Sequence, residues 1–268
     1  MKQFLCLLLF LSSTSAIADG FPPLDGRVSN CENRWFLKST DDPLIHLLGF
    51  AYLDPTAGFT FEHNGEVKIN ESGDIVRLPS EFRDKARLII RFDSDFKVAC
   101  LSNEIVTKLK LPLIPDWLHF YKDEREPGPH NVTWASQYNH IGASQKALEF
   151  LKEAEKQNYK SSKYYFELGF ALNALGKFQD AVQQLQVAVK EYPNHTEIIA
   201  ELAYAHFGLR DLERAVEFYK LALKADKKKT SQRRWEFAQN ISVAYSMLDD
   251  KKNSDAWKDK ADNWKPKP

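Results

Sequence analysis

The sequence predicts an α+β multidomain protein, in which a small antiparallel β domain with sandwich-like strand spacing precedes an α-helical solenoid. Two observations predict this fold class. Short runs of β-branched and aromatic residues, separated by turn residues, occupy residues 19–122. A pattern of small and apolar residues then recurs with a 34-residue period through residues 130–268. A chain of 268 residues is long enough for two such domains.

The first residues, MKQFLCLLLFLSSTSAIADG, are typical of a secretory signal peptide. Lys2 precedes a short apolar run, and Ala16-Ile17-Ala18 supplies an A-x-A cleavage site. The apolar run is too short to span a bilayer as a retained helix. We therefore expect residues 1–18 to be removed and the mature protein to be exported, soluble, and periplasmic or extracellular.

The β domain is predicted over residues 19–122 from the runs NRWFLKS, LIHLLGFAYL, GFTFEH, EVKIN, DIVRLP, ARLIIRF, FKVACL and IVTKLKL. Within it, FTFEHNGEVKI predicts a hairpin, because Asn64-Gly65 suits a two-residue type I′ turn. The apolar positions of this hairpin alternate with polar ones, which predicts one packed face. These positions are Phe59, Phe61, Val67 and Ile69.

Two cysteines, Cys31 and Cys100, remain after cleavage of the signal peptide. An even number in an exported chain indicates a disulfide, with two buried thiols as the alternative. The bond would close a loop of about 70 residues and add about 3–4 kcal/mol by restricting the unfolded chain. A metal site is disfavoured because no His or carboxylate neighbours either cysteine at ligand spacing.

No motif supports catalysis. HExxH, GxSxG, GxxxxGK[ST] and GxGxxG are all absent, and the seven histidines are scattered. We therefore predict no enzyme, no metal and no cofactor. Removing Lys2 from the 37 basic residues leaves 36 against 37 acidic ones. This balance does not favour nucleic acid or an anionic membrane as a partner, and no other segment is apolar enough to span a membrane.

A polar stretch rich in proline and glycine, residues 123–129, is the predicted linker to the solenoid. Beyond it the 34-residue period predicts pairs of amphipathic helices. The turns between paired helices contain Gly142 and Gly176, which suit a positive φ. A small residue recurs where the two helices of a pair must approach closely, at Ala135, Gly169 and Ala203. Three windows are in register: Trp134-Ala135, Tyr138, Ala147, Leu151 and Ala154; Leu168-Gly169, Leu172, Ala181, Leu185 and Ala188; Leu202-Ala203, His206, Ala215, Tyr219 and Ala222.

This pattern resembles the tetratricopeptide repeat family, whose helix–turn–helix signature is matched closely by YYFELGFALNALGKFQDAVQQLQVAVKEYP. The resemblance covers roughly half of the chain and implies a concave surface that binds protein. It places units at about 128–161, 162–195 and 196–229, with a degenerate fourth unit at 235–268 after an insertion of about five residues.

In this family, the face of each first helix that lies opposite the packed face lines the concave groove. Carried onto this chain, that face collects aromatic and amide side chains, which suit contact with a polypeptide segment. The predicted groove residues are Ser136, Asn139, His140, Phe166, Phe170, Asn173, Tyr204, Phe207 and Gln239. The sequence therefore predicts an exported adaptor or scaffold that binds a protein or peptide in this groove.

Three alternatives remain open. The C-terminal helix, with Trp257 and Trp264, or the N-terminal domain could fill the groove instead of a partner. The groove could also join copies of the chain into a homo-oligomer. Finally, the β domain could bind glycan or cell-wall material, with the repeats as an assembly arm.

Overall fold

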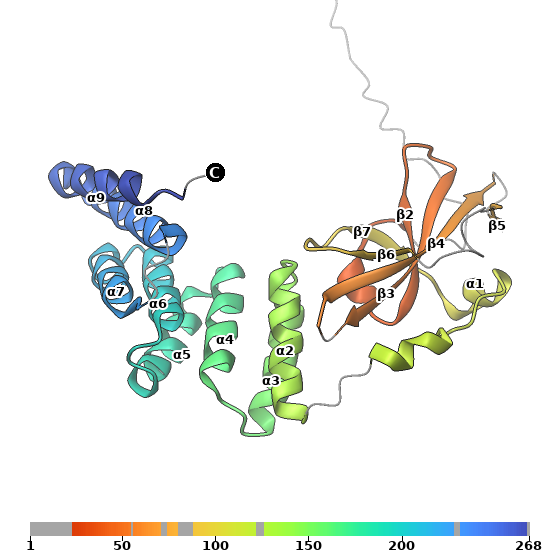
Figure 1. Ribbon diagram of the computed structural model, residues 1–268, viewed down its shortest axis with the longest axis horizontal. Coiled ribbons are helices and arrows are strands. Elements are labelled where there is room, and N and C mark those ends of the chain that lie inside the picture. Colours follow the sequence, from red (N-terminus) through yellow and green to blue (C-terminus); the bar gives the residue numbers. More distant parts are fainter. Residues whose placement is uncertain are drawn as a thin grey trace, which may run out of the picture. The chain divides into compact units, whose positions relative to one another are not determined.

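The structure is a computed structural model that describes residues 23–54, 56–70, 74–79, 88–121, 126–227 and 231–266. The signal peptide predicted at residues 1–18 lies outside the described residues. The chain divides into two compact units (Figure 1). One takes the described parts of residues 1–52, 61–90 and 96–116, and the other those of residues 53–60, 91–95 and 117–268.

The N-terminal half forms an antiparallel sheet with strand order β1-β7-β2-β3-β4-β5, and β6 pairs with β4. The strands are β1 (Gly26–Arg27), β2 (Arg34–Ser39), β3 (Ile45–Asp54), β4 (Gly58–Ile69), β5 (Ile75–Arg77), β6 (Leu88–Arg91) and β7 (Lys97–Cys100). The short helical segments are η1 (Val28–Cys31), α1 (Asn103–Lys108) and η2 (Asp116–Tyr121). All described strands join one sheet, so the antiparallel prediction is confirmed and the sandwich-like packing stays a prediction.

Aromatic side chains from neighbouring strands form the core of the sheet. Phe36 on β2 lies opposite Gly49 on β3 in the strand register. A Cβ atom at Gly49 would come within 2.7 Å of the Phe36 ring, so the glycine makes room for that ring. The Phe36 ring also meets the ring of Phe61 on β4 edge-on, with centroids 5.4 Å apart. Phe36 is fully buried.

The hairpin predicted at Asn64-Gly65 is wrong, because β4 continues through both residues. The turn lies instead between β3 and β4. There Oδ1 of Asp54 accepts hydrogen bonds from the backbone N–H groups of Thr56 and Ala57, each at 2.7 Å. Gly65 does have a positive φ of 85°, but it lies inside strand β4 and not in a turn. Pairing of β4 with β3 on one side, and with β5 and β6, keeps the strand extended.

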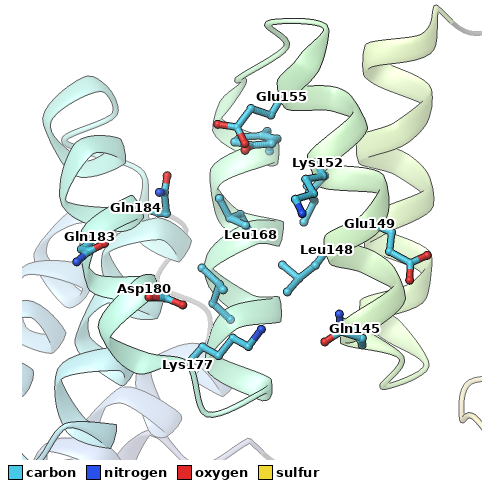
Figure 2. Close-up of a pocket in the computed structure, with 13 residues that line it drawn as sticks. Gln145, Leu148, Glu149, Lys152, Glu155, Leu168, Lys177, Asp180, Gln183 and Gln184 are labelled. Atoms are coloured by element: carbon cyan, nitrogen blue, oxygen red, sulfur yellow. The ribbon is translucent and has the colours of Figure 1, made fainter.

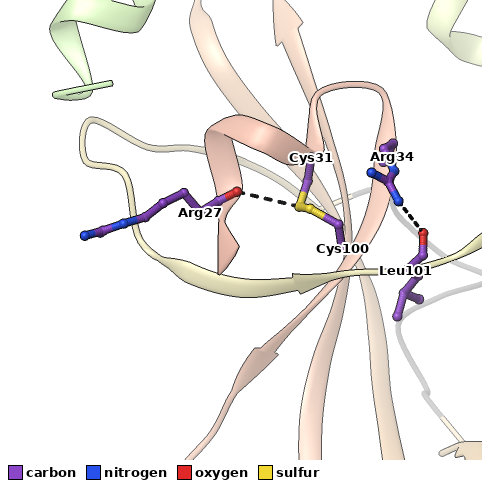
Figure 3. The surroundings of a disulfide bond; sticks show 5 residues. All are labelled: Arg27, Cys31, Arg34, Cys100 and Leu101. Atoms are coloured by element: carbon purple, nitrogen blue, oxygen red, sulfur yellow. Dashed lines mark hydrogen bonds between the residues drawn. A yellow bond between two sulfur atoms is a disulfide. The ribbon is translucent and has the colours of Figure 1, made fainter. Parts of the chain in front are cut away.

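A disulfide joins Cys31 at the end of η1 to Cys100 at the end of β7 (Figure 3). This is the bond that the even cysteine count predicts. The two Cα atoms are 5.5 Å apart, although 69 residues separate them in the chain. Next to it, the guanidinium group of Arg34 donates to the backbone carbonyl of Leu101 at 3.0 Å. The disulfide and this hydrogen bond both connect the segment at the start of β2 to the end of β7.

Eight helices follow in the part of the chain that the structure describes. They are α2 (Pro127–His140), α3 (Ser144–Lys156), α4 (Ser162–Ala174), α5 (Phe178–Glu191), α6 (Thr196–Gly208), α7 (Leu212–Ala225), α8 (Ser231–Met247) and α9 (Lys251–Trp264). Each even-numbered helix packs against the helix that follows it. Helix α2 begins inside the predicted linker 123–129, of which residues 123–125 lie outside the described residues.

The spacing of the helices reproduces the sequence period. Helices α3, α5 and α7 begin at Ser144, Phe178 and Leu212, which are evenly spaced with the 34-residue period. Helix α9 begins at Lys251, slightly later than this period would place it, which agrees with the insertion expected before a fourth helix pair. Across the described ranges, no helix combines the length and the apolar character needed to cross a membrane.

Candidate functional site

The first helix of each pair lines the inner side of the solenoid. Helices α2, α4 and α6 contact one another in succession. By contrast, a pocket of about 420 Å³ opens between the second helices α3 and α5 (Figure 2). A stack whose first helices lie closer together than its second helices curves toward the first ones. The concave face is therefore formed by α2, α4 and α6.

Close packing inside each helix pair depends on the small residues that the sequence repeats. A Cβ atom at Gly169 on α4 would lie 2.6 Å from Cδ2 of Leu185 on α5. Gly142, in the turn between α2 and α3, has a φ of 81°, and Gly176, in the turn between α4 and α5, has a φ of 70°. Both positive values were predicted from the sequence. Arg210 occupies the same repeat position in the third unit and adopts a φ of 64° without the freedom of glycine.

Two of the predicted groove residues, Asn139 and Asn173, connect neighbouring units. The Nδ2 group of Asn139 donates to the backbone carbonyl of Glu167 at 3.0 Å and to its Oε2 at 2.9 Å. The Nδ2 group of Asn173 donates in the same way to Glu201, at 2.9 and 2.8 Å. Each partner lies 28 residues further along the chain. Both asparagine side chains are buried, so their N–H groups are used inside the protein.

Three predicted aromatic residues, Phe166, Phe170 and Tyr204, form an aromatic strip on the concave face. Phe166 and Phe170 lie on α4, with ring centroids 6.4 Å apart, and Tyr204 lies on the neighbouring helix α6. Phe170 is 36 % exposed and Tyr204 is 47 % exposed. Phe178 at the start of α5 supports the strip, because its ring lies 6.3 Å from that of Tyr204.

The other predicted groove residues are more dispersed. His140 and Gln239 are exposed, at the end of α2 and on α8. Ser136 is half-buried on α2. Phe207 packs against the buried cluster formed by α6, α7 and α8, so much of its ring serves the core. The structure therefore brings together the aromatic part of the predicted set on α4 and α6.

Sequence reasoning missed two carboxylates on the same helices, Glu167 and Glu201, which we call the carboxylate pair. Each lies three residues before an aromatic residue of the strip, Phe170 or Tyr204, so it shares that side of its helix. Burial, with a smaller contribution from the charge of Glu167, raises the pKa of Glu201 to about 7, and the hydrogen bond from Asn173 opposes this shift. The two glutamates could have been found from the sequence, because they are 34 residues apart and therefore occupy the same position in successive repeats.

The C-terminal helix α9 packs against α8. The Nζ atom of Lys220 on α7 lies 5.8 Å from the ring centre of Trp257. The guanidinium carbon of Arg234 on α8 lies 4.1 Å from that of Trp264. Both tryptophans of α9 thus engage α7 and α8.

No group of three or more His, Cys, Asp or Glu residues within the described ranges is arranged to hold a metal ion. The concave face instead combines exposed aromatic rings with carboxylates, which suits non-covalent recognition.

The fold of the second unit, helix pairs that recur with a 34-residue period and carry an aromatic inner face, defines a helical repeat protein. Two tetratricopeptide repeat family models match the sequence, over residues 142–196 and 172–235. The C-terminal half of the chain therefore contains tetratricopeptide repeats, as predicted. No curated protein matches the sequence.

Solved structures also show similarity. A crystal structure of MamA is 20 % identical, covers 51 % of this chain and 77 % of its own, and gives a TM-score of 0.45. TTC0263, a thermophilic TPR protein in Thermus thermophilus, is 17 % identical, covers 52 % of this chain and 74 % of its own, and also gives a TM-score of 0.45.

Proposed function

We propose that this protein is an exported interaction scaffold that binds a polypeptide segment along the concave face of its tetratricopeptide repeats. The observation that carries the proposal is the exposure of Phe170 and Tyr204 on neighbouring first helices. Aromatic rings offer a large contact area at a low cost in side-chain entropy, and they dominate many protein interfaces.

Hydrogen bonds within the concave face limit the groups that are left to contact a partner. Because the Nδ2 groups of Asn139 and Asn173 already donate to Glu167 and Glu201, these amides do not supply free donors for a peptide backbone. Binding through the aromatic strip therefore depends on side chains of the partner. Export is supported by the predicted signal peptide at residues 1–18 and by the disulfide, a bond that persists in oxidising compartments.

The test is a crosslinked pull-down from the native cells with the wild-type protein and the double variant Phe170→Ala, Tyr204→Ala. Loss of a partner from the variant, with unchanged circular dichroism, supports binding through the strip. A matched control, Val187→Ala with Leu221→Ala, removes two exposed apolar side chains from the second helices α5 and α7 and should retain the partner. A partner that the strip variant retains would refute the proposal.

A further inference from the structure

The carboxylate pair carries negative charge that no described side chain neutralises. Glu167 and Glu201 form no ion pair with any Lys, Arg or His of the described residues. Glu197, one turn before Glu201 on α6, is different, since its Oε1 lies 2.6 Å from a guanidinium nitrogen of Arg233. Burial of Glu201, and to a smaller extent its repulsion by Glu167, raise the pKa of Glu201, as expected where no cation compensates.

The polar atoms around the pair are also rich in acceptors. Asn139 and Asn173, each 5 % exposed, direct Nδ2 at Glu167 and Glu201. Their Oδ1 atoms are buried and have no hydrogen-bond donor among the described residues. Unpaired buried acceptors are uncommon in folded proteins. Each carboxylate thus lies beside a buried amide side chain whose oxygen has no hydrogen-bond donor among the described residues.

The aromatic strip supplies the second half of a cation site. Phe170 and Tyr204 stand one helical turn beyond Glu167 and Glu201, on helices that contact each other. The face of an aromatic ring attracts an ammonium or guanidinium group, and a neighbouring carboxylate adds to that attraction. Glu201 is half-buried and both rings are exposed, so the site is open toward the concave side at Glu201, whereas Glu167 is only 5 % exposed and contributes through its charge.

We propose that the concave face recognises a lysine or arginine side chain of the bound polypeptide, held between the rings of Phe170 and Tyr204 and the carboxylate of Glu201, with the buried carboxylate of Glu167 adding negative charge behind it. The inference rests on the proposed function, because it names the chemistry of the segment that the groove takes. The cation would neutralise the carboxylate pair, and its stem would cover the aromatic strip.

The experiment uses a displayed library of random 12-residue peptides, selected on the full-length protein. The best selected peptide is then synthesised in two forms, with its lysine or arginine retained or replaced by glutamine. We expect the basic residue to be enriched, and its replacement to weaken binding by about tenfold. In the variant Glu167→Gln, Glu201→Gln the difference in affinity between the two peptides should become smaller, because only the attraction of the rings for the cation remains.

Glutamine keeps the oxygen that accepts from each asparagine, so this variant should fold, and circular dichroism checks it. The single variant Glu201→Gln provides a second measurement. The control Glu213→Gln, Glu217→Gln removes two exposed carboxylates from the second helix α7 and should bind like the wild type.

The outcomes separate the two proposals. If the selected peptides need Phe170 and Tyr204 but show no preference for a basic residue, the cation site is refuted and groove binding stands. The same conclusion follows if replacing the basic residue of the peptide by glutamine weakens binding to the Glu167→Gln, Glu201→Gln variant as much as it weakens binding to the wild type. If no peptide depends on the two rings, both proposals fail.

Discussion

Replacing Glu201 by glutamine should remove much of the pH dependence of the stability of the repeats. In the folded protein, burial together with the charge of Glu167 raises the pKa of Glu201 from 4.5 to about 7. One pKa unit corresponds to 1.36 kcal/mol, so the shift is linked to about 3 kcal/mol of stability. Below pH 4.5 both the folded and the unfolded states hold the proton. As the pH rises toward 7, the unfolded state releases it first, and the free energy of unfolding falls.

The assay is denaturant unfolding at pH 5 and pH 8, followed by circular dichroism. Linkage predicts that the Glu201 carboxyl lowers the unfolding free energy of the wild type by about 2.5 kcal/mol between these pH values. The variant Glu201→Gln should lack this contribution. Other titrating groups are common to both proteins and cancel in the difference. The control Glu217→Gln, on the exposed side of α7, should follow the wild type. Equal pH dependence of wild type and Glu201→Gln would refute the reasoning.

Three further substitutions test the packing between and within units, each by denaturant unfolding. Asn173→Ala removes both hydrogen bonds to Glu201 and leaves its Oε2 without this donor, so it should cost about 1–3 kcal/mol; a neutral result would mean that these hydrogen bonds add nothing. Gly169→Ala should lower the free energy of unfolding by about 1–3 kcal/mol, because the new Cβ would lie 2.6 Å from the fully buried Leu185. A gain of about 1 kcal/mol would show instead that the higher helix propensity of alanine outweighs this overlap. Arg210→Gly should stabilise by about 0.5–1 kcal/mol, because glycine tolerates the φ of 64°, and a loss would contradict the strain assigned to this turn.

The helical half could be predicted in detail because its determinants are local. The 34-residue period, the positive φ at Gly142 and Gly176, and the close approach of Gly169 to Leu185 all depend on residues within a single helix pair. The predicted aromatic strip followed from helical periodicity together with the family resemblance.

The remaining features depend on residues that are distant in sequence. The strand through Asn64-Gly65 is held extended by pairing with β3, β5 and β6, which outweighs the local turn preference. Asn173 was assigned to the groove because its helical position is exposed in an isolated unit. Its partner Glu201, 28 residues away, becomes visible only when the units stack. The raised pKa of Glu201 likewise arises only from burial in the assembled repeats.

The disulfide also determines how the chain would respond to a mechanical load. Tension applied at the N-terminus and at any point beyond Cys100 passes through the Sγ–Sγ bond, so the strands from β2 to β6 carry none of it. At about 3.5 Å per residue, the 69 residues that the bond bypasses correspond to about 24 nm of hidden length. After reduction, unfolding of the sheet under tension would release that length, so the oxidised protein would extend less under load than the reduced protein.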